Sequence, residues 1–321
     1  MTTILESGDF RYEVKMDWAK LPEGWSFHEV ADVAVDSKDR VYVFSRGKHP
    51  LIVFDREGNF LSSWGEGVFK RPHGVTVGPD ETLYCADDGD HTVRKCTLDG
   101  KILMTLGTPD QPAPAWSGHP FNRPTKVAVD PKTGEFYVTD GYGNSRVHKY
   151  SPDGKLLFSW GQPGTEPGEF NIVHTVCLDK EGLVYVADRE NDRVQIFDPK
   201  GKYITQWNNM HRACGLYITG GRRELVYVGE LATAVPVNKG MPKIGSCISI
   251  FNTKGKRLAR LGDTLPGEAP NQFISAHSLT VDVHGDIYVG EVSWTAMGSK
   301  LSPPRELRSL RKLIKVKAAG K

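Results

Sequence analysis

One unit of about 40 to 60 residues recurs six times along this chain, and this repeat constrains the fold more than any other feature. The third and fourth copies, residues 127–161 and 176–207, show it most clearly. Each copy has four short runs in which Val, Ile, Tyr and Phe alternate with polar residues, separated by Gly, Asp, Asn and Pro. Repeated four-stranded units without intervening helices predict an all-β fold, a six-bladed β-propeller with four antiparallel strands per blade.

The last copy is short of an outer strand, and the N-terminus offers one. Residues 10–17 contain the alternating run Tyr12 to Met16, which precedes the first copy. Because an open ring would leave sheet edges exposed, we expect this N-terminal strand to close the last blade. Residues 292–310 then form an insertion within that blade. The prediction is a single propeller domain over residues 1–321.

Composition excludes several classes of partner. The chain has 41 Lys plus Arg against 39 Asp plus Glu, a net charge of +2, which argues against nucleic-acid binding through a basic face. No apolar run approaches the roughly 18 residues of a membrane span, so no membrane partner is expected. The five cysteines include no C-x-x-C pair, which favours a reducing, cytoplasmic location over a disulfide framework.

Histidine occupies one position in every second copy. The residues four before the last apolar residue of each innermost strand are Ala31, His73, Thr125, His174, Cys214 and His277. Since the innermost strands of a propeller line its central channel, alternate members of this column would form a triangle of imidazoles, as a catalytic zinc site requires. The alternative interpretation is that the three histidines hydrogen-bond to backbone at strand ends. The other seven histidines are expected at the surface.

Two further residues follow second strands, at the same end of the sheets as the histidines. Arg46 could bind a carboxylate through its planar guanidinium group. Tyr142 could act as a general acid or base if a metal or a cation stabilised its phenolate. The acidic residues at this place are Asp87, Asp140, Asp188, Glu230 and Glu291. Because they recur in nearly every copy, we expect most of them to form turns or to cap backbone groups.

These residues carry a resemblance to a known family. The run Asp-Arg-Glu-Asn-x-Arg-Val at residues 188–194 resembles an NHL repeat, and nearly the whole chain resembles the peptidyl-α-hydroxyglycine α-amidating lyase domain. The matching segments are residues 43–47, 72–74, 124–129, 140–146, 167–174, 187–193, 277 and 288–290. The resemblance implies an NHL-type six-bladed propeller and an enzyme similar to a peptidylamidoglycolate lyase.

The resemblance also implies roles for the site residues. His73, His174 and His277 would hold zinc, with another divalent metal as the alternative. Tyr142 would be the catalytic base, and Arg46 would be a second catalytic residue that also binds the substrate. A lyase of this family cleaves the N–C bond of an α-hydroxyglycine, an α-hydroxy amide, to give an amide and glyoxylate or a related aldehyde.

The chain departs from the family pattern at several positions. Ser275 stands where the family has a Met two residues before the third histidine, which makes it an expected substrate contact. Ser278 replaces an Asp that serves a structural calcium, so that calcium site is not carried over. Asn122 and Gly143 stand where the family has cysteines, and losing a disulfide fits a cytoplasmic relative.

Two other functions fit the same fold. A metal-dependent hydrolase would attack a lactone, ester or amide with metal-bound hydroxide at the same site. A non-catalytic NHL interaction module would bind a protein or RNA on one face, although the near-neutral charge counts against RNA. Either enzyme would act on a small-molecule or peptidyl substrate.

Overall fold

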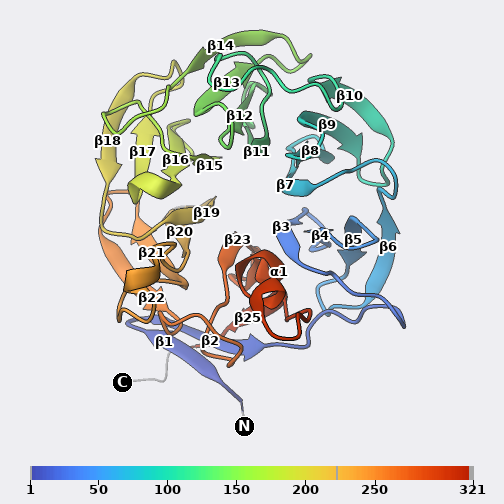
Figure 1. Cartoon of the computed structure of the whole chain (residues 1–321), viewed down its shortest axis with the longest axis vertical. Coiled ribbons are helices and arrows are strands. Elements are labelled where there is room, and N and C mark those ends of the chain that lie inside the picture. The colour runs from blue at the N-terminus through green and yellow to red at the C-terminus, as the bar shows by residue number, and fades with distance from the viewer. Residues whose placement is uncertain (1, 222, 318–321) are drawn as a thin grey trace. The chain divides into compact units, whose positions relative to one another are not determined.

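The computed structural model describes residues 2–221 and 223–317, and these residues form six antiparallel sheets (Figure 1). Each sheet contains strands that are consecutive in the chain, except the last, which combines the two chain ends. This confirms the predicted fold class, an all-β six-bladed propeller of four-stranded units. Among the described residues, no helix has the length and apolar character needed to cross a bilayer.

The strands follow one another as the repeat predicts. Sheet 1 contains β3 (Val30–Val35), β4 (Val41–Ser45), β5 (Leu51–Phe54) and β6 (Phe60–Trp64). Sheet 2 contains β7 (Pro72–Val77), β8 (Thr82–Asp87), β9 (Thr92–Thr97) and β10 (Ile102–Leu106). Sheet 3 contains β11 (Pro124–Val129), β12 (Phe136–Asp140), β13 (Arg146–Tyr150) and β14 (Leu156–Trp160). Sheet 4 contains β15 (Val173–Leu178), β16 (Val184–Asp188), β17 (Arg193–Phe197) and β18 (Tyr203–Trp207), with a short 3₁₀ turn η1 (Arg189–Asn191) after β16. Sheet 5 contains β19 (Ala213–Ile218), β20 (Leu225–Glu230), β21 (Cys247–Asn252) and β22 (Arg257–Leu261), with η2 (Pro236–Asn238) before β21. Sheet 6 contains β23 (Ala276–Val281), β24 (Ile287–Glu291), β25 (Leu310–Lys315), β2 (Phe10–Lys15) and β1 (Ile4–Ser7).

Burial follows strand order within a sheet. The second strands are mainly apolar and almost entirely buried, as in β16 with the sequence Val-Tyr-Val-Ala-Asp. In the fourth strand of the same sheet, β18, only Trp207 is buried, and in β6, β10 and β14 every residue is exposed or half-buried. Strands that are covered on both sides are the ones whose sequences lack polar alternation.

The N-terminal strand completes the last sheet, as predicted. β2 pairs antiparallel with β25, placing Val14 opposite Leu313. The sequence did not predict β1, which folds back on β2 through a two-residue turn at Gly8, where φ is +58°. Its addition makes sheet 6 five-stranded.

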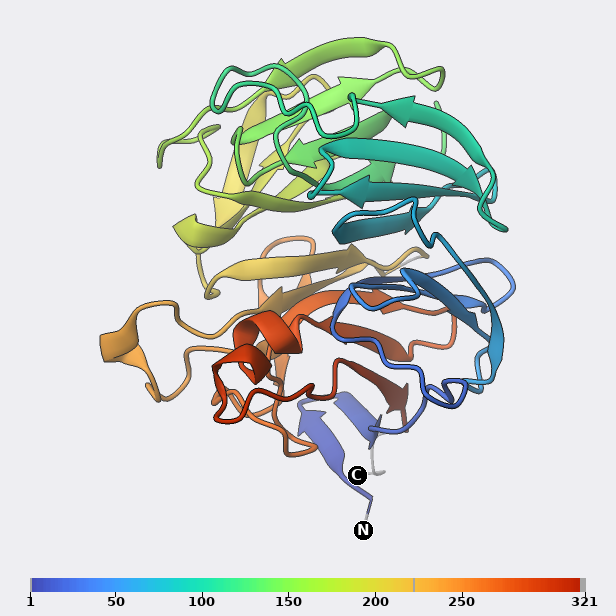
Figure 2. The same cartoon turned by 45° about the vertical axis from the view of Figure 1, so that its right-hand side comes forward.

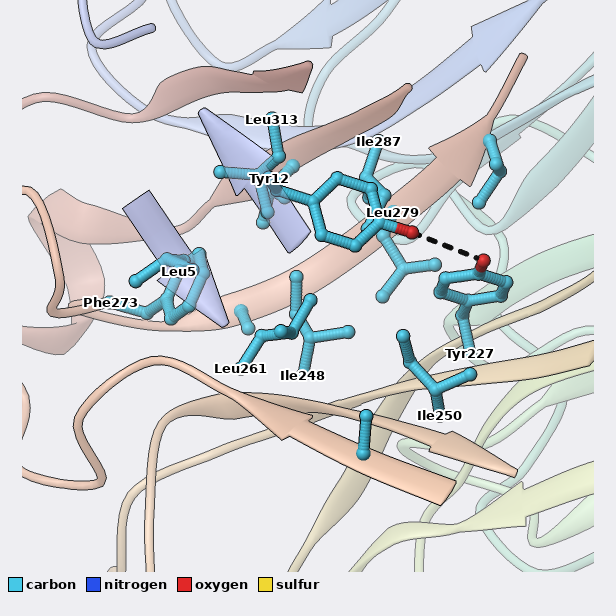
Figure 3. Close-up of a cluster of buried hydrophobic side chains, with 14 of the residues drawn as sticks. Leu5, Tyr12, Tyr227, Ile248, Ile250, Leu261, Phe273, Leu279, Ile287 and Leu313 are labelled. Atoms are coloured by element: carbon cyan, nitrogen blue, oxygen red, sulfur yellow. Dashed lines mark hydrogen bonds between the residues drawn. The ribbon is translucent and has the colours of Figure 1, made fainter. Parts of the chain in front are cut away.

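Sheets 5 and 6 share a hydrophobic cluster with these N-terminal strands (Figure 3). Tyr12 is fully buried, and its hydroxyl lies 3.4 Å from that of Tyr227. The chain end is therefore fixed by side-chain packing as well as by the backbone pairing.

The described chain divides into two compact units. The first comprises the residues up to Ser63 and from Met210 onward, with sheets 1, 5 and 6, and the second comprises Trp64–Asn209, with sheets 2, 3 and 4. A single domain over residues 1–321 stays a prediction, and its residues 1, 222 and 318–321 lie outside the described part. Between β24 and β25 the chain forms α1 (Ser293–Ala296) and η3 (Gly298–Lys300), the red helical segment in Figures 1 and 2.

Candidate active site

Each innermost strand has a β-bulge at its second residue. In β7, Pro72 and Gly74 pair with consecutive residues of β8, which leaves His73 as the extra residue. His174 in β15 and His277 in β23 are the extra residues of the same irregularity. The second residues of the other three innermost strands are Ala31, Thr125 and Cys214. The aligned column is therefore confirmed as one structural position, and a bulge there re-aims the side chain.

Buried carboxylates hold the loops that lead into these strands. Asp87 accepts the backbone N–H of Arg71 at 2.9 Å, and Asp188 accepts one from the loop before β15 at 2.7 Å. Glu291 accepts the N–H groups of residues 274 and 275. Burial raises the pKa of Asp87 and of Asp188. The expectation that the recurrent acidic residues cap backbone groups is confirmed. These hydrogen bonds hold the residues that directly precede each histidine-bearing strand.

In the unit of residues 64–209, three of the predicted site residues meet. The Tyr142 hydroxyl oxygen lies 3.0 Å from Nε2 of His73 and 3.2 Å from Nε2 of His174, and the two imidazole centroids are 4.8 Å apart. His73 Nδ1 lies 2.8 Å from the Thr125 carbonyl oxygen. Since a carbonyl can only accept, Nδ1 carries the proton, and Nε2 accepts from the phenol. Arg189 Nη1 donates to the same phenolic oxygen at 3.3 Å.

The loop that carries Tyr142 is positioned by its close contact with β15 and by a buried histidine behind it. A Cβ atom on Gly141 would lie 1.7 Å from the carbonyl oxygen of Val173, so only glycine lets this loop approach β15. Behind the loop, His148 Nε2 lies 3.2 Å from Asp140 Oδ2. His148 is fully buried, so its predicted surface position is wrong. It lies on β13, opposite Val138 and Ser159, and its ring packs against that of Phe121 at 5.6 Å between centroids.

Two arginines surround the Tyr142 ring. The guanidinium carbon of Arg123 lies 4.6 Å from the ring centroid, and that of Arg189 lies 5.4 Å away. Arg189 also pairs with Glu190 at 2.7 Å. The Tyr142 ring therefore has two guanidinium groups close to it, and its oxygen accepts a hydrogen bond from one of them. Sequence reasoning missed both arginines, although Arg189 stands in the NHL-like run that marks this end of the sheet.

The third histidine lies in the other unit and has the same kind of tether. His277 is 4% exposed, and its Nδ1 lies 2.8 Å from the carbonyl oxygen of Ala31. As in His73, this bond fixes the tautomer and directs the basic lone pair to Nε2, the arrangement that second-shell carbonyls impose on metal-binding histidines. Ser275 is buried two residues earlier, and its backbone N–H is bound by Glu291. His73 and His277, each with Nδ1 held by a carbonyl and Nε2 left as the ligand atom, fit the imidazole ligands of a zinc site.

Arg46 lies in the same unit as His277 and is anchored by an ion pair. Its Nη1 lies 2.8 Å from Glu29 Oε1, and the side chain is 8% exposed. Thr295, in α1, donates its backbone N–H and its hydroxyl to the same Glu29 carboxylate. Burial alone would raise the pKa of Glu29, but Arg46 and Thr295 bring it below its usual range. Arg46 is therefore held rigidly.

The positions where the family has cysteines contain a polar contact. A Cβ atom on Gly143 would lie 2.1 Å from Asn122 Oδ1, so the Asn122 side chain fills the space beside that glycine. Asn122 Nδ2 donates to the carbonyl oxygen of Ala113 at 2.8 Å. All five cysteines are free thiols.

Comparison with known proteins agrees with this architecture. The NHL repeat model matches residues 121–150 and 170–197. Human NHL repeat-containing protein 3 is 36% identical over 62% of this chain and 60% of its own length. Peptidyl-alpha-hydroxyglycine alpha-amidating lyase 1 of Drosophila melanogaster is 40% identical over 74% of this chain and 45% of its own length. The chain thus spans less than two thirds of either relative.

Among solved structures, a gluconolactonase from Xanthomonas campestris superposes with a TM-score of 0.60 at 13% identity, covering 96% of this chain and 91% of its own. At that identity the likeness concerns the fold alone. The chain carries NHL repeats, and its sequence resembles the peptidyl-α-hydroxyglycine α-amidating lyases.

Proposed function

We propose that this protein is a zinc-dependent lyase that cleaves the N–C bond of an α-hydroxyglycine-type substrate, giving an amide and glyoxylate or a related aldehyde. The observation that carries the proposal is the contact of one phenolic oxygen with two histidine Nε2 atoms, at 3.0 Å from His73 and 3.2 Å from His174. A core position seldom brings together two imidazoles, a phenol and two guanidinium groups, whereas acid–base catalysis beside a metal needs such a set.

The proposed ligands are His73, His174 and His277. The first two present Nε2 to one point. His277 is included because it holds the same bulge position in its strand and the same Nδ1-to-carbonyl tether. When bound there, zinc supplies Lewis-acid polarisation of the substrate hydroxyl oxygen.

The residues of the chain then perform the proton transfer. Tyr142, whose oxygen accepts a hydrogen bond from Arg189, is the base that takes the proton of the substrate hydroxyl. The electron pair of that O–H bond forms the aldehyde C=O bond as the C–N bond breaks. The pair released from the C–N bond stays on the amide nitrogen, and Tyr142 returns the proton to it. Atoms balance without water or a redox partner.

Arg46 is proposed to bind the substrate carboxylate. Its ion pair with Glu29 orients the guanidinium group before substrate arrives, so little conformational entropy is lost on binding. Ser275, two residues before His277, is proposed as a further substrate contact. Both assignments follow the sequence resemblance.

Product analysis tests the reaction. Zinc-loaded protein should convert N-benzoyl-α-hydroxyglycine into benzamide and glyoxylate in equal amounts, faster than the spontaneous reaction. Hydrolysis of the amide bond would instead release benzoate, and that product would establish the hydrolase alternative.

The non-catalytic alternative also has support, since the human relative is named only for its NHL repeats. A protein that releases neither product and holds no metal would be such a module. In that case the Tyr142 contacts would serve only the packing of sheets 2 to 4.

A further inference from the structure

A cluster of two arginines and one aspartate lies beside Tyr142, and two of its members, Arg71 and Asp88, have no part in the proposed reaction. It consists of Arg71, Asp88 and Arg123, and we call it the Arg–Asp–Arg cluster. Arg71 directly precedes the first residue of β7, and Arg123 directly precedes β11. Arg123 stacks on the Tyr142 ring at 4.6 Å, so the cluster adjoins the candidate catalytic residue.

One buried carboxylate oxygen holds both arginines. Asp88 Oδ2 accepts from Nη2 of Arg123 at 2.7 Å and from Nη1 of Arg71. Asp88 is fully buried, and its second oxygen has no hydrogen-bond partner among the described residues. Each guanidinium group is therefore tethered through a single N–H.

Most N–H groups of the two guanidinium groups have no acceptor in the described part of the chain. A guanidinium group has five N–H donors, and in the described part of the chain only one from each arginine has a protein acceptor. The side chains of Arg71 and Arg123 are 36% and 41% exposed, so a ligand can reach them. Arg71 and Arg123 share the single negative charge of Asp88, which leaves a net charge of +1. A bound anion would reduce the repulsion between the two arginines.

Neighbouring acidic groups are already engaged. Asp87 is capped by backbone N–H groups, including that of Arg71, and Asp90 pairs with Arg94. Glu190 pairs with Arg189, the other arginine near the Tyr142 ring. Among the described residues, Asp88 is therefore the one carboxylate that forms ion pairs with Arg71 and Arg123.

We propose that the Arg–Asp–Arg cluster is a carboxylate-binding subsite for the substrate of the reaction proposed above, and this inference rests on the proposed function. Two tethered, partly exposed guanidinium forks match a carboxylate better than any neutral group. The carboxylate has two chemical sources: an acidic group on the acyl side of the substrate, which would narrow the substrate class, or the glycine carboxylate, which the proposed function otherwise assigns to Arg46.

Binding of unreactive analogues tests the subsite without requiring turnover. N-succinylglycine carries carboxylates at both ends, and N-butyrylglycine lacks the acyl-side one. Calorimetry with the metal-loaded protein should show N-succinylglycine binding about tenfold more tightly, the gain expected of a charge-assisted bond at a partly exposed site. Arg71→Gln should abolish that preference, and Arg71→Lys, which keeps charge but loses the fork, should restore only part of it.

The outcomes separate the sources and the two proposals. If Arg71→Gln weakens both analogues about tenfold, the subsite holds the glycine carboxylate. Lys155→Gln removes one positive charge from an exposed position and serves as the control. If Arg71→Gln changes the affinity of neither analogue, as expected of Lys155→Gln, the subsite is refuted. Analogue preference that depends on Arg71 in a protein that releases no glyoxylate would refute the lyase and leave the subsite standing.

Discussion

The hydroxyl oxygen of Tyr142 lies 3.0 Å from Nε2 of His73, whose Nδ1 is held by the carbonyl oxygen of Thr125. The same phenolic oxygen lies 3.2 Å from Nε2 of His174. These contacts join three sheets through one side chain. They place a proton-transfer group at the nitrogen atoms that would bind a metal.

Removing that hydroxyl should abolish turnover without unfolding the chain. We expect Tyr142→Phe to lower kcat for glyoxylate release by about 10²- to 10⁴-fold, the usual contribution of a general base. The ring and its stacked arginines remain, so the melting temperature should change little. Steady-state kinetics and thermal unfolding check both expectations. Tyr203→Phe, on the outer strand β18, is the control, and equal losses in the two variants would contradict the assignment.

Gly141 should be intolerant of any side chain. A Cβ atom there would lie 1.7 Å from the Val173 carbonyl oxygen, so Gly141→Ala must displace the Tyr142 loop from β15. We expect a loss of about 1–3 kcal/mol in the free energy of unfolding and a fall in activity. Chemical denaturation measures the first. Gly220→Ala has nothing within 4 Å of the added atom and should be neutral, so a comparable loss there would argue against a local clash at Gly141.

The Glu29–Arg46 pair should contribute stability that depends on pH. Because the folded-state pKa of Glu29 is lowered, its contribution is complete above the ordinary glutamate pKa and is lost as pH falls through the lowered value. Glu29→Gln should therefore cost about 1–3 kcal/mol at pH 7, and the difference from the natural chain should shrink below about pH 5. Urea unfolding across that pH range measures it. A difference that stayed constant or grew on acidification would contradict the ion-pair explanation.

The N-terminal strand should be needed for stability. Leu313 is fully buried opposite Val14, within the cluster of Figure 3. Leu313→Ala should cost about 2–5 kcal/mol in the free energy of unfolding. Val316→Ala, just beyond β25, trims a half-buried apolar side chain and keeps the backbone hydrogen bond to Arg11, so it should cost far less. If both variants unfolded alike, the pairing of β2 with β25 would not be the stabilising contact.

The sequence predicted the sheets and the histidine column because both depend on periodicity. Strand alternation and turn residues recur at the same offsets in each copy, so the position of His73 in one copy locates His174 and His277 in others. Arg123 and Arg189 were missed because their roles arise from contacts across loops, which have no period. β1 was missed because a short hairpin on an outer strand follows no repeat. The buried His148 was misplaced because burial on a third strand depends on packing between sheets, which strand alternation alone does not report.

The metal content of the purified chain tests the central claim most directly. Protein prepared without chelator and analysed by mass spectrometry should contain one zinc per chain, and His73→Ala, His174→Ala and His277→Ala should each lose most of it. His284→Ala, an exposed histidine on a turn, should keep it. A metal-free natural chain, or full zinc retention in the His277→Ala variant, would contradict a three-histidine site and with it the proposed lyase.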